Sequence, residues 1–388
     1  MKKKKINIII AVTDAVLAAA MSAALIYSFS IMKEVSDQPA ADMWAGTDSE
    51  IPFTAVSVYT DETNAFDLQG IYRLRSEIAQ KTEEQITGLS EGYSDDCWYG
   101  IKEMIVSGGK GSFTVSAYYT GGDYFNVHTP EVISGSVYNS ETMNIDTVVL
   151  DDYASWKLFG SLDTAGMKVT IGDSEYLISA VISSPDIKEK NLKKAYDNAG
   201  SANIYLPYQA ANTVFGEEQK FTAYETLLPD QITGFASGIV VSALSSSGAV
   251  SGVSDSTLKK YSAQGLMFNE SVLLTDSRSD RFSLERIRQF SKNMFGDTGV
   301  SFELPFYAEA AENVMMRLGV IYKIFFPVFI LLMVSACYWI VQLCSLAALV
   351  VKRIYKYFDD KADKKKLEKY YKTHPKIIIK EIDEGESK

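Results

Sequence analysis

Two long apolar stretches lie near the ends of the chain, and shorter alternating patterns fill the region between them. The first stretch, Ile6 to Met32, has 27 residues and one charge, and the second, Ile324 to Val351, has 28 residues and no charge. As a helix, each would reach roughly 40 Å at about 1.5 Å per residue, which exceeds the ~30 Å hydrocarbon core of a bilayer. We therefore expect both stretches to be transmembrane helices.

Basic residues flank each apolar stretch on one side. Four lysines, Lys2 to Lys5, precede the first stretch, whereas its other end carries Lys33 and the start of the second carries Arg317 and Lys323. The basic residues that follow the second stretch are Lys352, Arg353, Lys356, Lys361, Lys364, Lys365 and Lys366. Lys and Arg beside a span are retained in the cytoplasm. Both termini are therefore expected there, with the protein in the cell (plasma) membrane.

The pattern predicts five parts along the chain. They are a cytoplasmic N-terminus (1–5), transmembrane helix 1 (6–32), an extracytoplasmic domain (33–317), transmembrane helix 2 (318–351) and a cytoplasmic tail rich in basic and aromatic residues (352–388). The extracytoplasmic part has 21 basic and 40 acidic residues, a net charge of about −19. Such a surface excludes nucleic acid as a partner and leaves the lipid bilayer as the expected one.

The first stretch has a second interpretation as a cleaved signal peptide. Lysines followed by an apolar run and small residues also fit a secretion signal. The run is longer than the apolar core of such signals, and no A-x-A site follows it before Lys33. Either interpretation exports the middle of the chain. Only Cys97 lies outside the spans, so that region must fold without an internal disulfide.

The first half of the middle region predicts strands and one helix. Residues Ile51 to Tyr59 alternate like a half-buried strand, and Phe66 to Gln85 carries apolar residues at steps of three and four, which is typical of a helix. Trp98 to Val106 and Ser112 to Tyr119 are predicted strands of a hairpin whose turn contains the glycines of SGGKG.

The second half predicts a strand, a helix and more strands. Thr147 to Leu150 is followed by a helix, Asp151 to Leu158, which begins with an acidic cap and ends at Phe159-Gly160. Further predicted strands are Met167 to Ile171, Tyr176 to Ile182 and Asn203 to Leu206.

Toward the second span the prediction is less regular. Thr222 to Leu274 is expected to be strand-like with loops, with the Ser- and Gly-rich Ser245 to Ser256 as a surface loop or helix entry. A helix at Ser283 to Phe295 and a strand at Val300 to Leu304 follow. Tyr307 to Leu318 is a helix that leads into the second span without a breaker. The fold class is α+β with mixed sheets.

Between Ser116 and Tyr208, several short motifs follow one another. They are D-Y-F (Asp123, Tyr124, Phe125), G-x-x-Y (Gly135, Tyr138), a helix end L-F-G (Leu158, Phe159, Gly160), a turn with Asp163, Gly166 and Lys168, and a paired-strand segment. In this order the motifs resemble the periplasmic core domain of MacB-type and FtsX-like ABC transporter permeases. The resemblance implies ABC-type permease and ATPase subunits as partners. Full members continue with three membrane helices, whereas one follows here, so a truncated two-helix form is expected.

The search for catalytic chemistry finds no convincing set. The chain has two histidines, His128 and His374, and His128 beside Thr129-Pro130 is expected to be an ordinary polar surface residue. Acidic pairs at Asp95-Asp96 and Asp151-Asp152 are interpreted as loop or helix-cap residues. We therefore predict no catalytic, cofactor-binding or metal-binding residues, no cofactor and no enzyme activity.

One ionisable residue, Asp14, lies inside the first span, where such residues are functional suspects. The favoured interpretation is that Asp14 reaches the cytoplasmic headgroups, with a relay or a contact between helices as the alternative. The leading hypothesis for function is a non-enzymatic permease-like subunit of an ABC-transporter-type complex. The alternative is a stand-alone membrane-anchored receptor or regulator, and self-association is open in either case. An exported enzyme is the third hypothesis and lacks the residues it would need.

Overall fold

The computed structural model describes residues 2–33, 52–85, 95–140, 144–184, 202–232, 234–250, 273–277, 282, 284, 287–288 and 306–373. The chain divides into two compact units. Tyr27–Lys323 forms one unit, called the domain below, and Met1–Ile26 with Ile324–Lys388 forms the other, called the helix pair.

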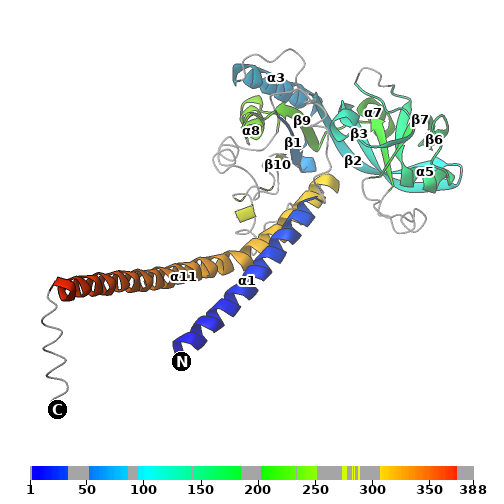
Figure 1. Cartoon of the computed structure of the whole chain (residues 1–388). Coiled ribbons are helices and arrows are strands. Elements are labelled where there is room, and N and C mark those ends of the chain that lie inside the picture. The colour runs from blue at the N-terminus through cyan, green and yellow to red at the C-terminus, as the bar shows by residue number, and fades with distance from the viewer. Residues whose placement is uncertain are drawn as a thin grey trace, which may run out of the picture. The chain divides into compact units, whose positions relative to one another are not determined.

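A mixed β-sheet organises the domain (Figure 1). Its strands are β1 (Phe53–Thr60), β2 (Asp95–Gly108), β3 (Gly111–Gly122), β4 (Val132–Gly135), β5 (Thr147–Asp151), β6 (Lys168–Ile171), β7 (Ser174–Ile182), β8 (Asn203–Pro207), β9 (Ala223–Pro229) and β10 (Leu273–Ser277). The order is β10-β1-β9-β2-β3-β8-β5-β7-β4, and β6 pairs with β2 and β7. The β3–β8 and β5–β7 pairs are parallel and the other pairs are antiparallel. The predicted α+β class with a mixed sheet is confirmed.

The long hairpin of β2 and β3 joins two parts of this sheet. The start of β2, Asp95–Tyr99, pairs with β9, whereas Val106 and Ser107 near its end pair with β6. Residues 116–120 of β3 pair with β8. Figure 1 shows the hairpin running from the part with β1, β9, α3 (Leu68–Gln85) and α8 (Phe235–Ser247) to the part with β7 and α5 (Asp152–Phe159).

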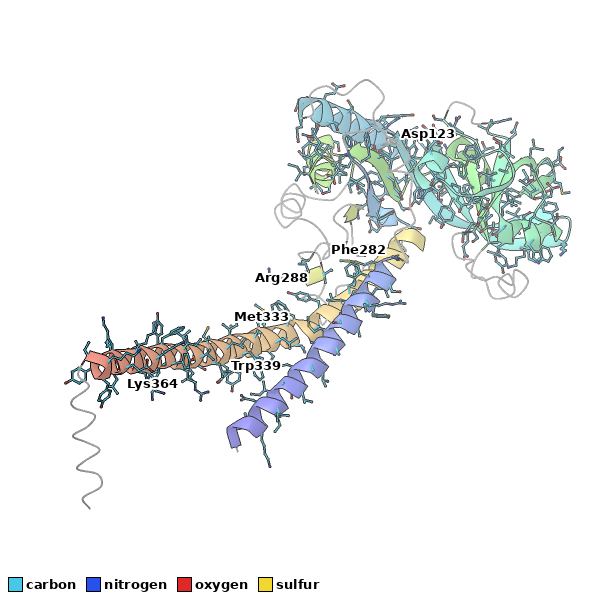
Figure 2. All side chains as sticks on the ribbon, viewed as in Figure 1. Asp123, Phe282, Arg288, Met333, Trp339 and Lys364 are labelled. Carbon is cyan, nitrogen blue, oxygen red and sulfur yellow. The ribbon has the colours of Figure 1, made fainter. Side chains whose placement is uncertain are left out.

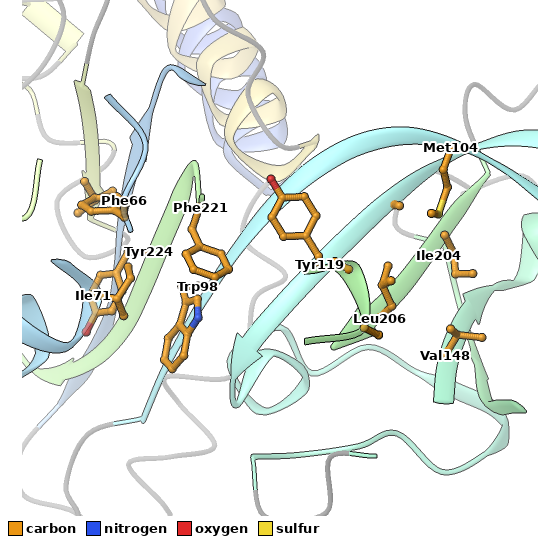
Figure 3. Close-up of a cluster of buried hydrophobic side chains, with 14 of the residues drawn as sticks. Phe66, Ile71, Trp98, Met104, Tyr119, Val148, Ile204, Leu206, Phe221 and Tyr224 are labelled. Carbon is orange, nitrogen blue, oxygen red and sulfur yellow. The ribbon is translucent and has the colours of Figure 1, made fainter. Parts of the chain in front are cut away.

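Alternation along the strands divides their side chains between two buried clusters, because successive side chains in a strand point to opposite faces. In β2, Trp98 and Met104 enter the large core, whereas Cys97 and Tyr99 enter the second cluster. Figure 3 shows ten labelled members of the large core, which are Phe66, Ile71, Trp98, Met104, Tyr119, Val148, Ile204, Leu206, Phe221 and Tyr224. Helices α3, α5, α8 and α7 (Tyr208–Phe215) contact the strands or one another around this core.

The second cluster, called the aromatic cluster below, lies on the opposite face. Its buried members are Tyr59, Cys97, Tyr99, Tyr124, Phe125, Val127, Tyr138, Val149, Ala180, Ile182, Tyr205, Ala223 and Leu227. A short helix, α4 (Tyr124–His128), supplies Tyr124, Phe125 and Val127 to it.

The predicted caps of α5 are confirmed. Asp151 is the N-cap, and its Oδ1 accepts a hydrogen bond of 2.6 Å from the backbone N–H of Ala154. Gly160 ends the helix at φ 75°, a conformation that glycine adopts without the cost a side chain would add.

The prediction for Thr222 to Leu274 is wrong in one respect. Residues 235–247 form α8, and Ser245–Ser247 are its last turn, with Gly248 as the left-handed C-cap. The helix was missed because its exposed face, formed by Gly238, Ser242 and Ser246, is narrow and uncharged, and the consecutive Ile239, Val240 and Val241 are typical of a buried strand.

Other expectations fall partly outside the described residues. The strand predicted at Val300 to Leu304 lies wholly outside them. Of the helix predicted at Ser283 to Phe295, only residues 284, 287 and 288 are described, and they are helical.

Among the described residues, two helices are long and apolar enough to cross a membrane, at Lys5–Lys33 and Val314–Thr373. They belong to α1 (Lys2–Lys33) and α11 (Phe306–Thr373). Because α11 begins at Phe306 and continues through the second apolar stretch, the predicted unbroken entry into that span is confirmed.

Candidate functional site

Three polar side chains, those of Cys97, His128 and Glu225, meet beside the aromatic cluster and are called the polar cluster below. Cys97 of β2 and Glu225 of β9 are direct partners in an antiparallel pair, so their side chains are neighbours on one face. His128 is the last residue of α4, which contacts both strands. All three side chains are buried, and their donor atoms lie within 4.8 Å of one another.

Two tyrosines hold the carboxylate of Glu225. Oε1 of Glu225 accepts hydrogen bonds from the hydroxyl of Tyr99 at 2.7 Å and from that of Tyr59 at 3.1 Å. Tyr59 lies on β1 and Tyr99 on β2, the two neighbours of β9 in the sheet. Because Oε1 accepts both hydroxyl hydrogen bonds, the other oxygen, Oε2, faces Nε2 of His128 at a distance of 3.4 Å.

The backbone at the end of α4 fixes His128. Thr129, the next residue, is the C-cap in the left-handed conformation at φ 45°, which is uncommon for a β-branched residue. Burial lowers the pKa of the His128 imidazole, and the nearby Glu225 carboxylate opposes this shift. The prediction of a polar surface role for His128 is wrong, because α4 turns the side chain into the domain.

Aromatic rings enclose the imidazole. The ring of Tyr124 lies 4.2 Å from that of His128 between centroids, and the ring of Tyr99 lies 5.9 Å away. Phe125 and Tyr205 continue this layer. The polar cluster is therefore shielded from bulk water, which strengthens electrostatic interactions inside it.

The motif residues of the family resemblance build this enclosure. Asp123 precedes α4, and its carboxylate accepts hydrogen bonds from the backbone N–H and hydroxyl of Ser140 (Figure 2 labels Asp123). Phe125 packs edge-on against Tyr138 at 5.0 Å, and the Tyr138 hydroxyl pairs with that of Thr120 at 2.8 Å. The D-Y-F and G-x-x-Y elements thus have a structural role at α4.

The polar cluster is poorly suited to thiol chemistry. Burial, aided by the nearby carboxylates of which Glu225 is the strongest, raises the pKa of the Cys97 thiol well above its usual range. Thiolate, not thiol, is the nucleophile, so the cysteine is unreactive in this state. What the arrangement offers is one sulfur, one nitrogen and one oxygen atom that can donate electron pairs to a common point.

The acidic pair Asp95-Asp96 lies at the start of β2, not in a loop. Asp96 forms an ion pair of 2.7 Å with Arg75 and accepts a hydrogen bond of 2.9 Å from the Tyr224 hydroxyl. Burial and the charge of Asp123 raise the pKa of Asp95 to about 6. The ion pair between Asp96 and Arg75 therefore ties α3 to the sheet, and this structural role differs from the loop or cap role that was predicted.

Asp14 has a different environment in the helix pair. Its Oδ2 accepts hydrogen bonds from the hydroxyl of Ser335 at 2.6 Å and from the indole N–H of Trp339 at 2.9 Å. The Tyr338 hydroxyl also donates to Asn7 at 2.9 Å. Figure 2 labels Trp339 on α11. The structure has one of the predicted alternatives for Asp14, a contact between the two helices.

A small apolar cluster joins the domain-side ends of α1 and α11, and we call it the junction. It contains Ile31 of α1 with Val314, Met315 and Leu318 of α11, all buried. Phe282 and Ile287 pack against it. The first and last helices of the chain therefore meet at the domain.

The polar cluster could not be predicted from the sequence because its three members lie far apart in the chain. Only the pairing of β2 with β9 and the placement of α4 bring them together. The alternation that places Cys97 and Tyr99 on one face was a usable signal, but nothing local to Glu225 indicated its partner.

No protein-family model and no curated protein matches the chain. Among solved structures, the periplasmic region of MacB from Actinobacillus actinomycetemcomitans matches 53% of this chain and 91% of its own, with 15% identity and a TM-score of 0.38. The extracellular domain of the noncanonic ABC-type transporter YknZ from Gram-positive bacteria matches 47% and 87%, with 12% identity and a TM-score of 0.33. A domain of a putative permease protein from Porphyromonas gingivalis matches 63% and 92%, with 12% identity and a TM-score of 0.32.

Proposed function

We propose that this chain is a membrane-anchored, non-enzymatic, permease-like subunit. In this role its extracytoplasmic domain senses, binds or mechanically couples within an ABC-transporter-type complex. The proposed topology has residues 1–5 and 352–388 in the cytoplasm, 6–32 and 318–351 in the membrane, and 33–317 outside. The basic flanks and the acidic middle of the chain support this topology.

The junction is the observation that carries the proposal. Ile31, which is 1% exposed, packs with Val314 and Leu318 at the domain-side ends of both helices. Because α11 continues from Phe306 into the apolar stretch without a break, a displacement of the domain would act on both helices at one place. A simple tether needs one helix and no such packing.

The side chains support a binding or coupling role over catalysis. The thiol of Cys97 is protonated and buried, and the imidazole of His128 is enclosed by aromatic rings. A hydrolytic site needs an activated nucleophile that a substrate can reach.

Purification from native membranes after mild cross-linking tests the proposal. The full chain should recover an ATP-binding subunit and a permease subunit. Leu318→Ser, which disturbs the junction, should weaken cytoplasmic ATP hydrolysis by the recovered complex. Met316→Ser, on the same helix turn but 47% exposed, is the matched control and should leave it unchanged.

Recovery of the chain without any transporter subunit would contradict the proposal. Recovery with a kinase, a protease or a cell-wall hydrolase would favour the stand-alone receptor or regulator instead.

A further inference from the structure

The geometry points to a transition-metal site of the zinc class in the domain, with Cys97, His128 and Glu225 as its protein ligands. The three side chains supply sulfur, nitrogen and oxygen, the donor types that Zn²⁺ accepts. This site is separate from the junction that carries the proposed function, so each can be tested without the other.

The distances fit one shared ion. Zn–ligand bonds of about 2.0 to 2.3 Å in a tetrahedron place neighbouring donor atoms roughly 3.3 to 3.6 Å apart. Nε2 of His128 and Oε2 of Glu225 are 3.4 Å apart, and all three donor atoms lie within 4.8 Å of one another. The widest of these separations therefore has to shrink by no more than about 1.2 Å for all three atoms to bind one ion.

The surrounding hydrogen bonds orient the carboxylate as a ligand. The hydroxyls of Tyr59 and Tyr99 both bind Oε1 of Glu225 and leave Oε2 toward His128. Partners that hold a ligand in this way tune metal sites, and their removal commonly weakens metal binding by about 10- to 100-fold. These tyrosines come from the strands on either side of β9, so the sheet itself fixes the orientation.

The charge of the cluster also favours a cation. Within the described part of the chain, Glu225 forms no ion pair with Lys or Arg, although it is 4% exposed. A buried carboxylate without a cationic partner is costly, and a bound metal ion supplies that charge. The rival interpretation is a buried hydrogen-bond network without an ion, which predicts no metal in the purified protein.

The experiment uses the full chain in detergent, carrying an affinity tag without histidine and produced in zinc-supplemented medium. Elemental analysis of the wild-type protein should find about one zinc per chain after gel filtration. Exchange for Co²⁺ should give a tetrahedral cobalt spectrum with a sulfur-to-cobalt charge-transfer band.

Cys97→Ser should abolish that charge-transfer band and lower the affinity at least tenfold. The matched control is the Cys337→Ser/Cys344→Ser double variant, whose cysteines lie in α11 and which should keep the full signal. Glu225→Gln, which keeps an acceptor for both tyrosines, should lower the affinity in the same direction as Cys97→Ser.

Wild-type protein without retained or rebindable metal would overturn the assignment, whatever the variants do. So would a cobalt charge-transfer band that survives Cys97→Ser and disappears in the double variant. If Cys97→Ser or Glu225→Gln fails to fold, the assignment is decided by the amount of zinc per wild-type chain and by the cobalt spectrum of the Cys337→Ser/Cys344→Ser double variant.

Discussion

Two carboxylates, Glu225 in the domain and Asp14 in the helix pair, are held in similar ways but by different chemistry. Each has one oxygen that accepts two hydrogen bonds from side chains of other elements. For Glu225 the donors are Tyr59 and Tyr99, and for Asp14 they are Ser335 and Trp339.

The difference lies at the second oxygen. Oε2 of Glu225 faces the imidazole of His128, with the Cys97 sulfur close by, so electron-pair donors gather at one point. The hydrogen-bond partners of Asp14, Ser335 and Trp339, are donors only, and they come from the other helix. The same arrangement of two donors on one oxygen therefore orients Glu225 toward further electron-pair donors, whereas for the half-buried Asp14 it links two helices.

Removing the carboxylate of Glu225 should have the largest effect. Glu225→Ala leaves the hydroxyls of Tyr59 and Tyr99 buried without their acceptor, at about 1 to 3 kcal/mol each. We expect the free energy of unfolding in chelator to fall by about 2 to 5 kcal/mol. Glu225→Gln keeps an acceptor oxygen and should lose less than half as much. Equal losses in the two variants, measured by denaturant titration, would show that the tyrosine hydrogen bonds do not contribute to the free energy of unfolding.

Asp151 is a further acidic residue to compare with Glu225 and Asp14, because its buried carboxyl group is bound by backbone N–H groups. Its oxygens accept from Ala154 N at 2.6 Å and from Asn203 N at 3.0 Å. Asp151→Ala should cost about 2 to 4 kcal/mol, from a lost cap of about 1 kcal/mol and an unsatisfied buried N–H.

The same residue gives a pH dependence with a definite sign. Burial raises the pKa of Asp151 from 3.8 to about 8, so the folded state keeps a proton that the unfolded chain releases. Its contribution to stability is fully present below pH 4 and is lost as the pH rises to about 8. Asp151→Asn carries no titratable group and should flatten this part of the stability curve. An unchanged slope would show that Asp151 does not titrate there.

The Asp14 link should have a smaller effect. Hydrogen bonds between membrane helices contribute about 0.6 kcal/mol each, and up to about 1.7. Asp14→Leu should therefore weaken helix association by about 1 to 2 kcal/mol, while Asp14→Asn keeps an acceptor and loses less. Trp339 emission should shift to shorter wavelength in Asp14→Leu. The same shift in Asp14→Leu/Trp339→Phe would assign it to another tryptophan and contradict the contact.

An exposed ion pair should have the smallest effect and serves as the reference. Lys168 and Glu175 lie 2.7 Å apart, but both side chains are more than half exposed. Lys168→Ala should leave the melting temperature unchanged within error, because solvent and salt screen such pairs. A clear loss of stability would mean that surface charge matters here as much as the buried groups do.

Local patterns predicted most of the domain's elements. Asp151 and Gly160 marked both ends of α5, and the glycines after Val106 marked the hairpin of β2 and β3. The prediction was wrong at α8, where the exposed face, formed by Gly238, Ser242 and Ser246, is narrow and uncharged and so gives a weak helix signal.

The candidate sites were harder to predict because pairing between distant segments creates them. Cys97 and Glu225 become neighbours only through strand register, and His128 reaches them through the packing of α4 on β2 and β9. Asp14 was recognised as a residue of interest from its place in an apolar stretch, but its partners on α11 could not be identified from the sequence.

Cysteine accessibility in intact cells tests the proposed topology most directly. In a background without the native cysteines, Glu103→Cys, at an exposed position of β2, should react with a membrane-impermeant maleimide. Lys365→Cys in the C-terminal part of α11 should react only after the cells are permeabilised. Labelling of Lys365→Cys in intact cells, with Glu103→Cys protected, would contradict a domain held outside the membrane by two helices.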